Sequence, residues 1–148
     1  MALHSPDSLA PMAGFLNGLT LAKLEHLGDI YSPGVEFHDP VHHTRGLPAL
    51  RQVYQQLFQQ LSEVSVTVSD AHGDERTGFL LWTLRYQLRG EPRAITGTSH
   101  LQFAPDGRVA EQHDHWDASF QTQQELPLLG WAMRGIKRLV QTKPKNGT

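Results

Sequence analysis

The spacing of the apolar residues changes once along the chain, at Ser62, and this change restricts the fold more than any other feature. Before it, apolar residues recur every three or four positions, which is typical of a helix face. After it the spacing is two, which is typical of strands. The pattern predicts helices over 8–19, 20–27 and 48–61, a short extended segment at 35–39, and strands near 64–72, 78–89, 94–104 and 108–118. The short connectors "GDERTG", "RGEP" and "APDG" are typical of hairpins, so we expect an α+β fold with an antiparallel meander.

Composition limits the size and class of the protein. A chain of 148 residues with 39% hydrophobic and 19% charged residues is expected to form one globular domain over 1–148. The chain has no cysteine, which excludes disulfides and fits a cytoplasmic protein. Residues 1–125 carry 8 basic and 15 acidic side chains, and this acidic balance argues against nucleic acid as a partner.

The charge balance reverses near the C-terminus, where residues 126–148 carry five basic side chains and no acidic one. Residues 126–142 have the spacing of a basic amphipathic helix, and we expect a flexible tail over 143–148. We favour packing of the apolar stripe on the domain or on a second copy. The alternative is peripheral contact of this helix with an anionic membrane surface.

The order of these elements resembles a known family. With "VEFHDP" followed by "GLPALRQVY" and a late "DGRVAEQHDHWD", residues 9–120 resemble the nuclear transport factor 2-like superfamily, and in particular its SnoaL-like domains, which are related to ketosteroid isomerase. The resemblance implies a cone-shaped, strongly curved, mostly antiparallel sheet, with N-terminal helices closing over a deep apolar pocket. It also implies a homodimer formed through the outer face of the sheet.

With this fold, the strand spacing assigns side chains to faces. Gln112, Asp114 and Trp116 share one face of the last strand, and a large aromatic such as Trp116 is expected to point inward. The resemblance places further side chains from the helices and from neighbouring strands in the same pocket. The expected substrate-binding residues are Phe15, Tyr54, Trp82, Tyr86, Ser99, Gln112 and Trp116.

Two carboxyl groups are the candidate catalytic residues. Asp39 matches the proton-abstracting aspartate of ketosteroid isomerase, and Asp114 is similar to the acid/base aspartates of the SnoaL-like cyclases. Burial disfavours a charged carboxylate and raises its pKa toward the working range of a general acid or base. With Tyr54 as a hydrogen-bond donor, such a site suits a cofactor-free isomerase, cyclase or dehydratase that acts on an apolar or polycyclic substrate.

Other residues keep a second interpretation open. Phe15 and Ser99 stand where ketosteroid isomerase has an acidic tyrosine and aspartic acid, which argues against steroid isomerisation. Asp39 precedes Pro40, and aspartates at such positions are common turn residues. The alternative is therefore a non-catalytic module for ligand binding, protein interaction or dimerisation.

The nine histidines do not predict a metal site. His113, His115 and Asp117 share one strand face, but the chain has no recognised zinc motif, and a solvated or paired polar face is the more common outcome. We expect His38, His100, His113 and His115 to lie on the outer, dimer-forming face. Neither a metal nor a cofactor is expected.

Overall fold

The change of spacing at Ser62 separates helices from long strands as predicted. The computed structural model describes residues 9–117, and residues up to Trp116 form one compact unit. The first half contains α1 (Leu9–Asn17), the 3-10 helix η1 (Ala22–His26), α2 (Leu27–Ile30), β1 (Tyr31–His38), β2 (His43–Arg45) and α3 (Leu47–Gln60). The second half contains β3 (Ser62–Gly73), β4 (Thr77–Leu88), β5 (Glu91–Phe103) and β6 (Val109–Trp116). The helix and tail predicted for 126–148 lie outside the described residues.

The helices begin and end where local chemistry allows. Helix α1 buries Leu9, Met12, Phe15 and Leu16, the stripe that its sequence predicts. Helix α3 begins after Gly46, whose φ of +90° favours glycine, and has a proline in its first turn. The prediction of one helix over 20–27 was wrong in detail, because i to i+3 backbone bonds from Lys23 and Leu24 form a 3-10 helix there.

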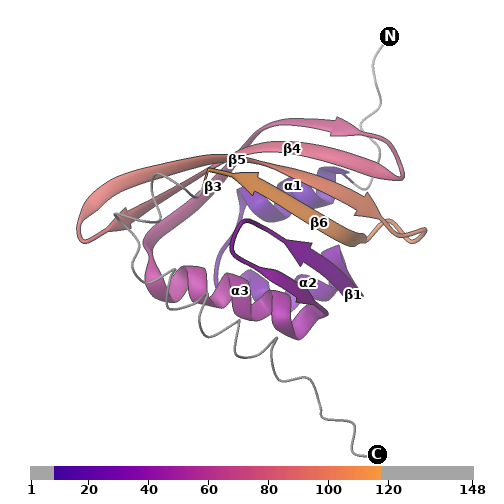
Figure 1. The fold of residues 1–148 in the computed structure, drawn as a ribbon, viewed down its shortest axis with the longest axis horizontal. Coiled ribbons are helices and arrows are strands. Elements are labelled where there is room, and N and C mark those ends of the chain that lie inside the picture. Colours follow the sequence, from indigo (N-terminus) through magenta and orange to yellow (C-terminus); the bar gives the residue numbers. More distant parts are fainter. Residues whose placement is uncertain (1–8, 118–148) are drawn as a thin grey trace, which may run out of the picture. The chain divides into compact units, whose positions relative to one another are not determined.

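The six strands form one sheet in the order β2-β1-β6-β5-β4-β3 (Figure 1). The antiparallel meander from β3 to β6 is confirmed. Strand β2 and the parallel pairing of β1 with β6 were not predicted. The outermost strands, β2 and β3, do not pair with each other, so the sheet is open. The pairings β1/β6, β3/β4 and β5/β6 each contain a register shift, and irregularities of this kind bend a sheet.

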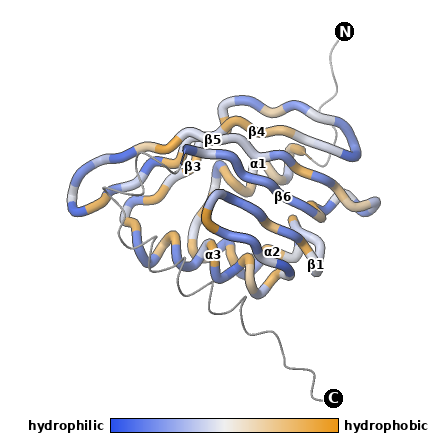
Figure 2. Tube along the Cα trace, in the orientation of Figure 1, coloured by the Kyte–Doolittle hydropathy of each residue, from blue (hydrophilic) through white to orange (hydrophobic). Residues whose placement is uncertain are grey.

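Alternating burial gives the sheet an inner and an outer face. Leu80, Trp82 and Tyr86 of β4 are buried, and so are Ile95, Gly97, Ser99 and Leu101 of β5, which confirms the predicted faces. Helix α1 packs on β3, and α3 packs on β1 and β2. Hydrophobic and hydrophilic positions follow one another along the long strands (Figure 2). Among residues 9–117, no helix has both the length and the apolar character that crossing a membrane requires.

The inner face is closely packed where β4 and β5 pair, and a substitution at Gly97 tests this packing. An added Cβ would lie 2.5 Å from Cη2 of Trp82 and 2.9 Å from the carbonyl oxygen of His115. We expect Gly97→Ala to lower the free energy of unfolding by about 1–3 kcal/mol, because the Trp82 ring must move. Urea denaturation followed by circular dichroism measures the change.

Gly14 provides the matched control, since it lies in α1 and a Cβ there meets no atom within 4 Å. Gly14→Ala is expected to leave stability unchanged or to raise it by up to about 1 kcal/mol. Equal stability of the Gly97→Ala variant and the unmodified chain would contradict the packing described for the inner face.

Candidate active site

Strand β6 lies in the middle of the sheet, between β1 and β5, and carries Asp114 on its inner face. Asp114 is directly opposite Ser99 of β5, and Gln112 lies two residues earlier on the same face. Ser99 and Gln112 are the two polar side chains that are fully buried among the described residues. Because buried polar groups need hydrogen-bond partners, their contacts show what the inner face is built around.

The first hydrogen-bond chain runs across three strands. The indole Nε1 of Trp82 donates to the hydroxyl of Ser99 at 2.9 Å, and that hydroxyl donates to Oδ1 of Asp114 at 2.5 Å. Trp82 can only donate, so the direction of the chain is fixed. Ser99 therefore serves as an acceptor for Trp82 and as a donor to the carboxyl group of Asp114.

A second chain reaches Asp114 from the helical side. The amide Nε2 of Gln112 donates to Oδ1 of Asp114 at 2.9 Å, and Oε1 of Gln112 accepts the hydroxyl of Tyr31 at 2.7 Å. The hydroxyls of Tyr31 and Tyr54 are 2.8 Å apart. Tyr31 has one proton and gives it to Gln112, so Tyr54 must be the donor to Tyr31. Both chains thus direct their donors to the same oxygen of Asp114.

The surroundings of Asp114 change its acidity. Burial raises the pKa of this carboxyl from about 3.8 to about 7, and the negative charge of Asp39 acts in the same direction. The hydrogen bonds from Ser99 and Gln112 oppose the rise but do not cancel it. As a whole residue, Asp114 is half-buried. Near neutral pH, both its acid and its base form are populated.

Burial also keeps the two tyrosines protonated. It raises the pKa of Tyr31 well above 10, with a further contribution from Tyr54. Burial likewise raises the pKa of Tyr54, and the nearby charge of Asp114 adds to that effect. Both phenols therefore remain hydrogen-bond donors at any pH at which the protein is expected to work.

The other predicted carboxylate, Asp39, lies at the end of β1 in a different setting. Its Oδ1 accepts the backbone N–H groups of Val41 at 2.8 Å and His42 at 2.6 Å. Nδ1 of His42 lies 2.9 Å from Oδ1 and 2.8 Å from Oδ2 of Asp39, and both side chains are 8% exposed. Such contacts are typical of an aspartate that stabilises a turn. Both carboxylate oxygens of Asp39 therefore have partners within the same turn, including the imidazole of His42.

The remaining predicted residues divide between two places. Phe15 packs edge-on against Tyr31 and Tyr54, with ring centroids 5.9 Å apart in both pairs, and Trp116 is half-buried opposite Gly97. Tyr86 instead lines a hollow of about 350 Å³ at the other end of β4 and β5, with Glu63, Arg85, Gln87, Pro92, Arg93 and Ala94. Tyr86 is paired with Arg93, six residues along β5 from Ser99, so it is not part of the Asp114 cluster.

Two residues of this region were missed by the sequence analysis. Tyr31 precedes the extended segment predicted at 35–39 and was given no role, yet it begins β1 and is fully buried. His42 was also given no role in the site, and no spacing rule links it to Asp39. A tyrosine at the start of an extended segment was the only available signal, and it was too weak to distinguish a site residue from a core residue.

The family follows from a comparison of sequences. Residues 12–112, more than half of the chain, match the model of the SnoaL-like domain. The chain belongs to the SnoaL-like family. The matched segment contains Tyr31, Asp39, Tyr54, Trp82, Ser99 and Gln112 and ends two residues before Asp114. A comparison with curated proteins gave no match.

Solved structures share the SnoaL-like fold at low sequence identity. A candidate SnoaL-like polyketide cyclase from Shewanella putrefaciens CN-32 is 15% identical, with a TM-score of 0.67 over 80% of this chain and 96% of that one. A hypothetical protein with a ketosteroid isomerase-like fold from Catenulispora acidiphila, in complex with trimethylamine, is 14% identical, with a TM-score of 0.65 over 77% and 88% of the two chains. An epoxide hydrolase of the LEH-like kind from M. tuberculosis is 12% identical, with a TM-score of 0.63 over 75% and 79%. These likenesses confirm the predicted fold.

The raised pKa of Asp114 in this SnoaL-like domain has a consequence for stability. Between about pH 4 and pH 7 the unfolded chain releases the Asp114 proton more readily than the folded one, so folding loses stability as pH rises. We expect Asp114→Asn to raise the free energy of unfolding by about 1–3 kcal/mol at pH 8. This is below the ceiling of about 4 kcal/mol for the full shift, because the side chain is partly exposed.

Urea denaturation at pH 8 and at pH 4 measures this effect, and the gain should fade toward pH 4, where the folded state holds the proton and the unfolded state begins to take it up. Asp74→Asn is the control, because the backbone N–H groups of Thr77 and Arg76 lower the pKa of Asp74. That variant should show no gain at pH 8. A loss of stability in Asp114→Asn at pH 8 would contradict the raised pKa.

Proposed function

We propose that this SnoaL-like protein binds an apolar, ring-containing molecule and catalyses cofactor-free proton transfer on it, with Asp114 as general base and acid. One observation carries the proposal: a half-buried carboxyl group with a pKa of about 7 accepts its hydrogen bonds on a single oxygen. A group that titrates near the working pH is well suited to take up a proton in one step and return it in another.

The arrangement distinguishes the two oxygens of Asp114. Oδ1 accepts from Ser99 and from Gln112, whereas no described residue donates a hydrogen bond to Oδ2. In the base form, Oδ2 is the atom that would take a proton from a substrate carbon. In the acid form, the proton belongs on Oδ2, because Oδ1 already receives two donors. The same oxygen would therefore act in both directions.

Ser99, Gln112, Tyr31 and Tyr54 support this role as positioning residues. The proton of Tyr54 is given to Tyr31, and that of Tyr31 to Gln112, so neither phenol has a proton left for a substrate oxygen. Their function in the proposal is to hold the Gln112 amide in one orientation, with its N–H directed at Asp114. A rotamer of Asp114 locked in this way lowers the cost of reaching the reactive geometry.

The class of substrate rests on the surrounding side chains and on the family. Phe15 of α1 and Trp82 are buried on the inner side of the sheet and Trp116 is half-buried there, and aromatic side chains favour apolar rings as ligands. Relatives of the same fold include a candidate polyketide cyclase and an epoxide hydrolase of the LEH-like kind. Isomerisation, cyclisation and dehydration each need a proton to be removed from carbon and another to be delivered.

Hydrogen exchange at carbon tests the proposal without knowledge of the natural substrate. We would incubate the full chain with 2-tetralone and related ring ketones in D₂O and follow deuterium uptake next to the carbonyl by NMR. The unmodified protein should accelerate uptake for at least one ketone, with a rate that rises through about pH 7 as Asp114 loses its proton. Asp114→Asn should lower that rate by about 100-fold to 10,000-fold.

Asp39→Asn and Asp74→Asn serve as comparisons in the same assay. Asp74 is exposed and bonded within its own turn, so its variant should match the unmodified chain. If Asp39→Asn abolishes uptake and Asp114→Asn does not, Asp39 with His42 is the proton acceptor instead. Binding of the ketones without any uptake would favour the alternative, a non-catalytic ligand-binding module.

A further inference from the structure

The outer face of the sheet carries a row of aromatic rings that spans all six strands. Direct cross-strand pairs link each member to the next. From β2 to β3, the row consists of His43, His38, His113, His100, Phe79 and His72. This face is opposite to that of Asp114, so the row is separate from the candidate active site and independent of the proposed function.

The imidazoles are closest to one another at the β1–β2 end of the row. The rings of His38 and His43 stack with centroids 3.7 Å apart, and the ring of His113 meets that of His38 edge-on at 4.1 Å. Glu36 lies on the same face of β1, two residues before His38, and its Oε2 is 3.8 Å from Nε2 of His38. One ligand atom from each of Glu36, His38 and His43 lies within 4.8 Å of the other two.

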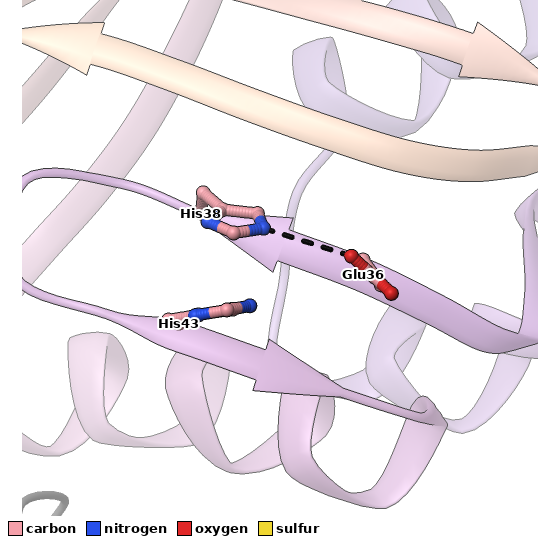
Figure 3. Close-up of side chains that lie close together, drawn as sticks. All are labelled: Glu36, His38 and His43. Carbon is pink, nitrogen blue, oxygen red and sulfur yellow. Dashed lines mark ion pairs between the residues drawn. The ribbon is translucent and has the colours of Figure 1, made fainter.

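Figure 3 shows how the three side chains are directed. Nitrogen atoms of both imidazoles face the side on which the Glu36 carboxylate lies, and the three groups come from the paired strands β1 and β2. His43 is exposed and His38 and Glu36 are half-buried, so an ion can reach them from solvent. The three side chains thus offer one ligand atom each to an ion, on a face that solvent reaches.

The hairpin between β1 and β2 holds the two histidines in register. The backbone N–H of Asp39 donates to the carbonyl of His42 at 3.0 Å, and the Asp39 carboxylate accepts the N–H groups of Val41 and His42. These bonds close a short turn, and they keep His38 directly opposite His43. The pair is therefore arranged before any ion arrives, which lowers the entropic cost of binding.

Arg45 orients the third ligand. Its guanidinium donates to Oε1 of Glu36, which leaves Oε2 directed at the histidines. In protein metal sites, a ligating carboxylate is regularly hydrogen-bonded by a neighbouring residue that does not itself bind the metal.

We propose that Glu36, His38 and His43 form a binding site for a divalent transition-metal ion, of which zinc is the probe of choice. Two imidazoles and one carboxylate are the ligand types that zinc, cobalt and nickel accept, and magnesium and calcium prefer oxygen ligands alone. Bond lengths of about 2.0–2.2 Å put two ligand atoms of one tetrahedral ion about 3.3–3.6 Å apart. The ligand atoms now lie within 4.8 Å of one another, so binding requires the side chains to close by up to about 1.5 Å.

Calorimetry on the full chain tests the site. The protein must have its purification tag removed and be freed of metal with EDTA before titration with zinc chloride. We expect one zinc ion per chain at these residues. His38→Ala and His43→Ala should each weaken binding roughly tenfold or more, since loss of an outer-shell partner alone costs about 10-fold to 100-fold. Magnesium chloride should give no saturable binding in the same range.

Glu36→Gln and His72→Ala sharpen the comparison. Glutamine keeps the size of the side chain but loses the anionic ligand, so binding should weaken while the melting temperature stays within a few degrees. His72 belongs to the same row and is 2.8 Å from Asp70, at the opposite edge of the sheet. His72→Ala should leave zinc affinity within about twofold, because ligand loss is a local effect.

The absorption spectrum of bound cobalt provides an independent readout. Intense visible bands that appear with one equivalent of cobalt, and that are lost in His38→Ala and His43→Ala, would support a single site of low coordination number at these residues. The proposal is overturned if zinc binds the His38→Ala/His43→Ala double variant as tightly as the unmodified chain. It is also overturned if no saturable zinc binding is found, or if His72→Ala weakens binding as much as His38→Ala does.

Discussion

The parallel pairing of β1 with β6 is the contact on which the rest of the structure depends. It joins the first half of the chain to the meander, with Phe37 opposite Gln112 and His38 opposite His113. On the inner face it brings Tyr31 within reach of Gln112, and through it Tyr54 of α3. On the outer face it continues the row of histidines from the meander to the β1–β2 hairpin. Both sites described above lie along this one seam.

The inner network also explains why an acidic side chain is tolerated in the middle of the sheet. Each buried donor or acceptor that is named has a partner: Trp82 with Ser99, Ser99 and Gln112 with Asp114, and the tyrosines with each other and with Gln112. Unsatisfied groups at these positions would each cost about 1–3 kcal/mol. Burial still destabilises the charged form of Asp114, and the pKa of the carboxyl group rises as a result.

The sequence predicted the elements well and their partners less well. Alternation placed Gln112 and Asp114 on one face of β6, because side chains on a strand alternate whatever the strand pairs with. For β4 and β5, the family resemblance was also needed to choose the face of Trp82 and Ser99 as the inner one. Strand β2 has three residues and no apolar alternation, so it gives no signal. The parallel pairing joins residues 75 or more positions apart, such as Phe37 and Gln112, and spacing within a segment says nothing about such a partner. Tyr31 was missed for the same reason, since its role depends on Gln112 across that pairing.

Adjacent residues of β6 therefore take part in unrelated chemistry. Asp114 faces inward, where burial raises the pKa of a carboxyl group. His113 faces outward among other histidines, and partial burial together with the charge of His38 lowers the pKa of its imidazole. Both shifts favour the neutral form, although the groups are of opposite type, because desolvation by burial is the largest cause of each. A neutral carboxylic acid can deliver a proton, and a neutral imidazole at His113 avoids a like-charge contact with His38. The spacing of two keeps the candidate catalytic carboxyl group and the outer row of histidines on opposite faces of β6.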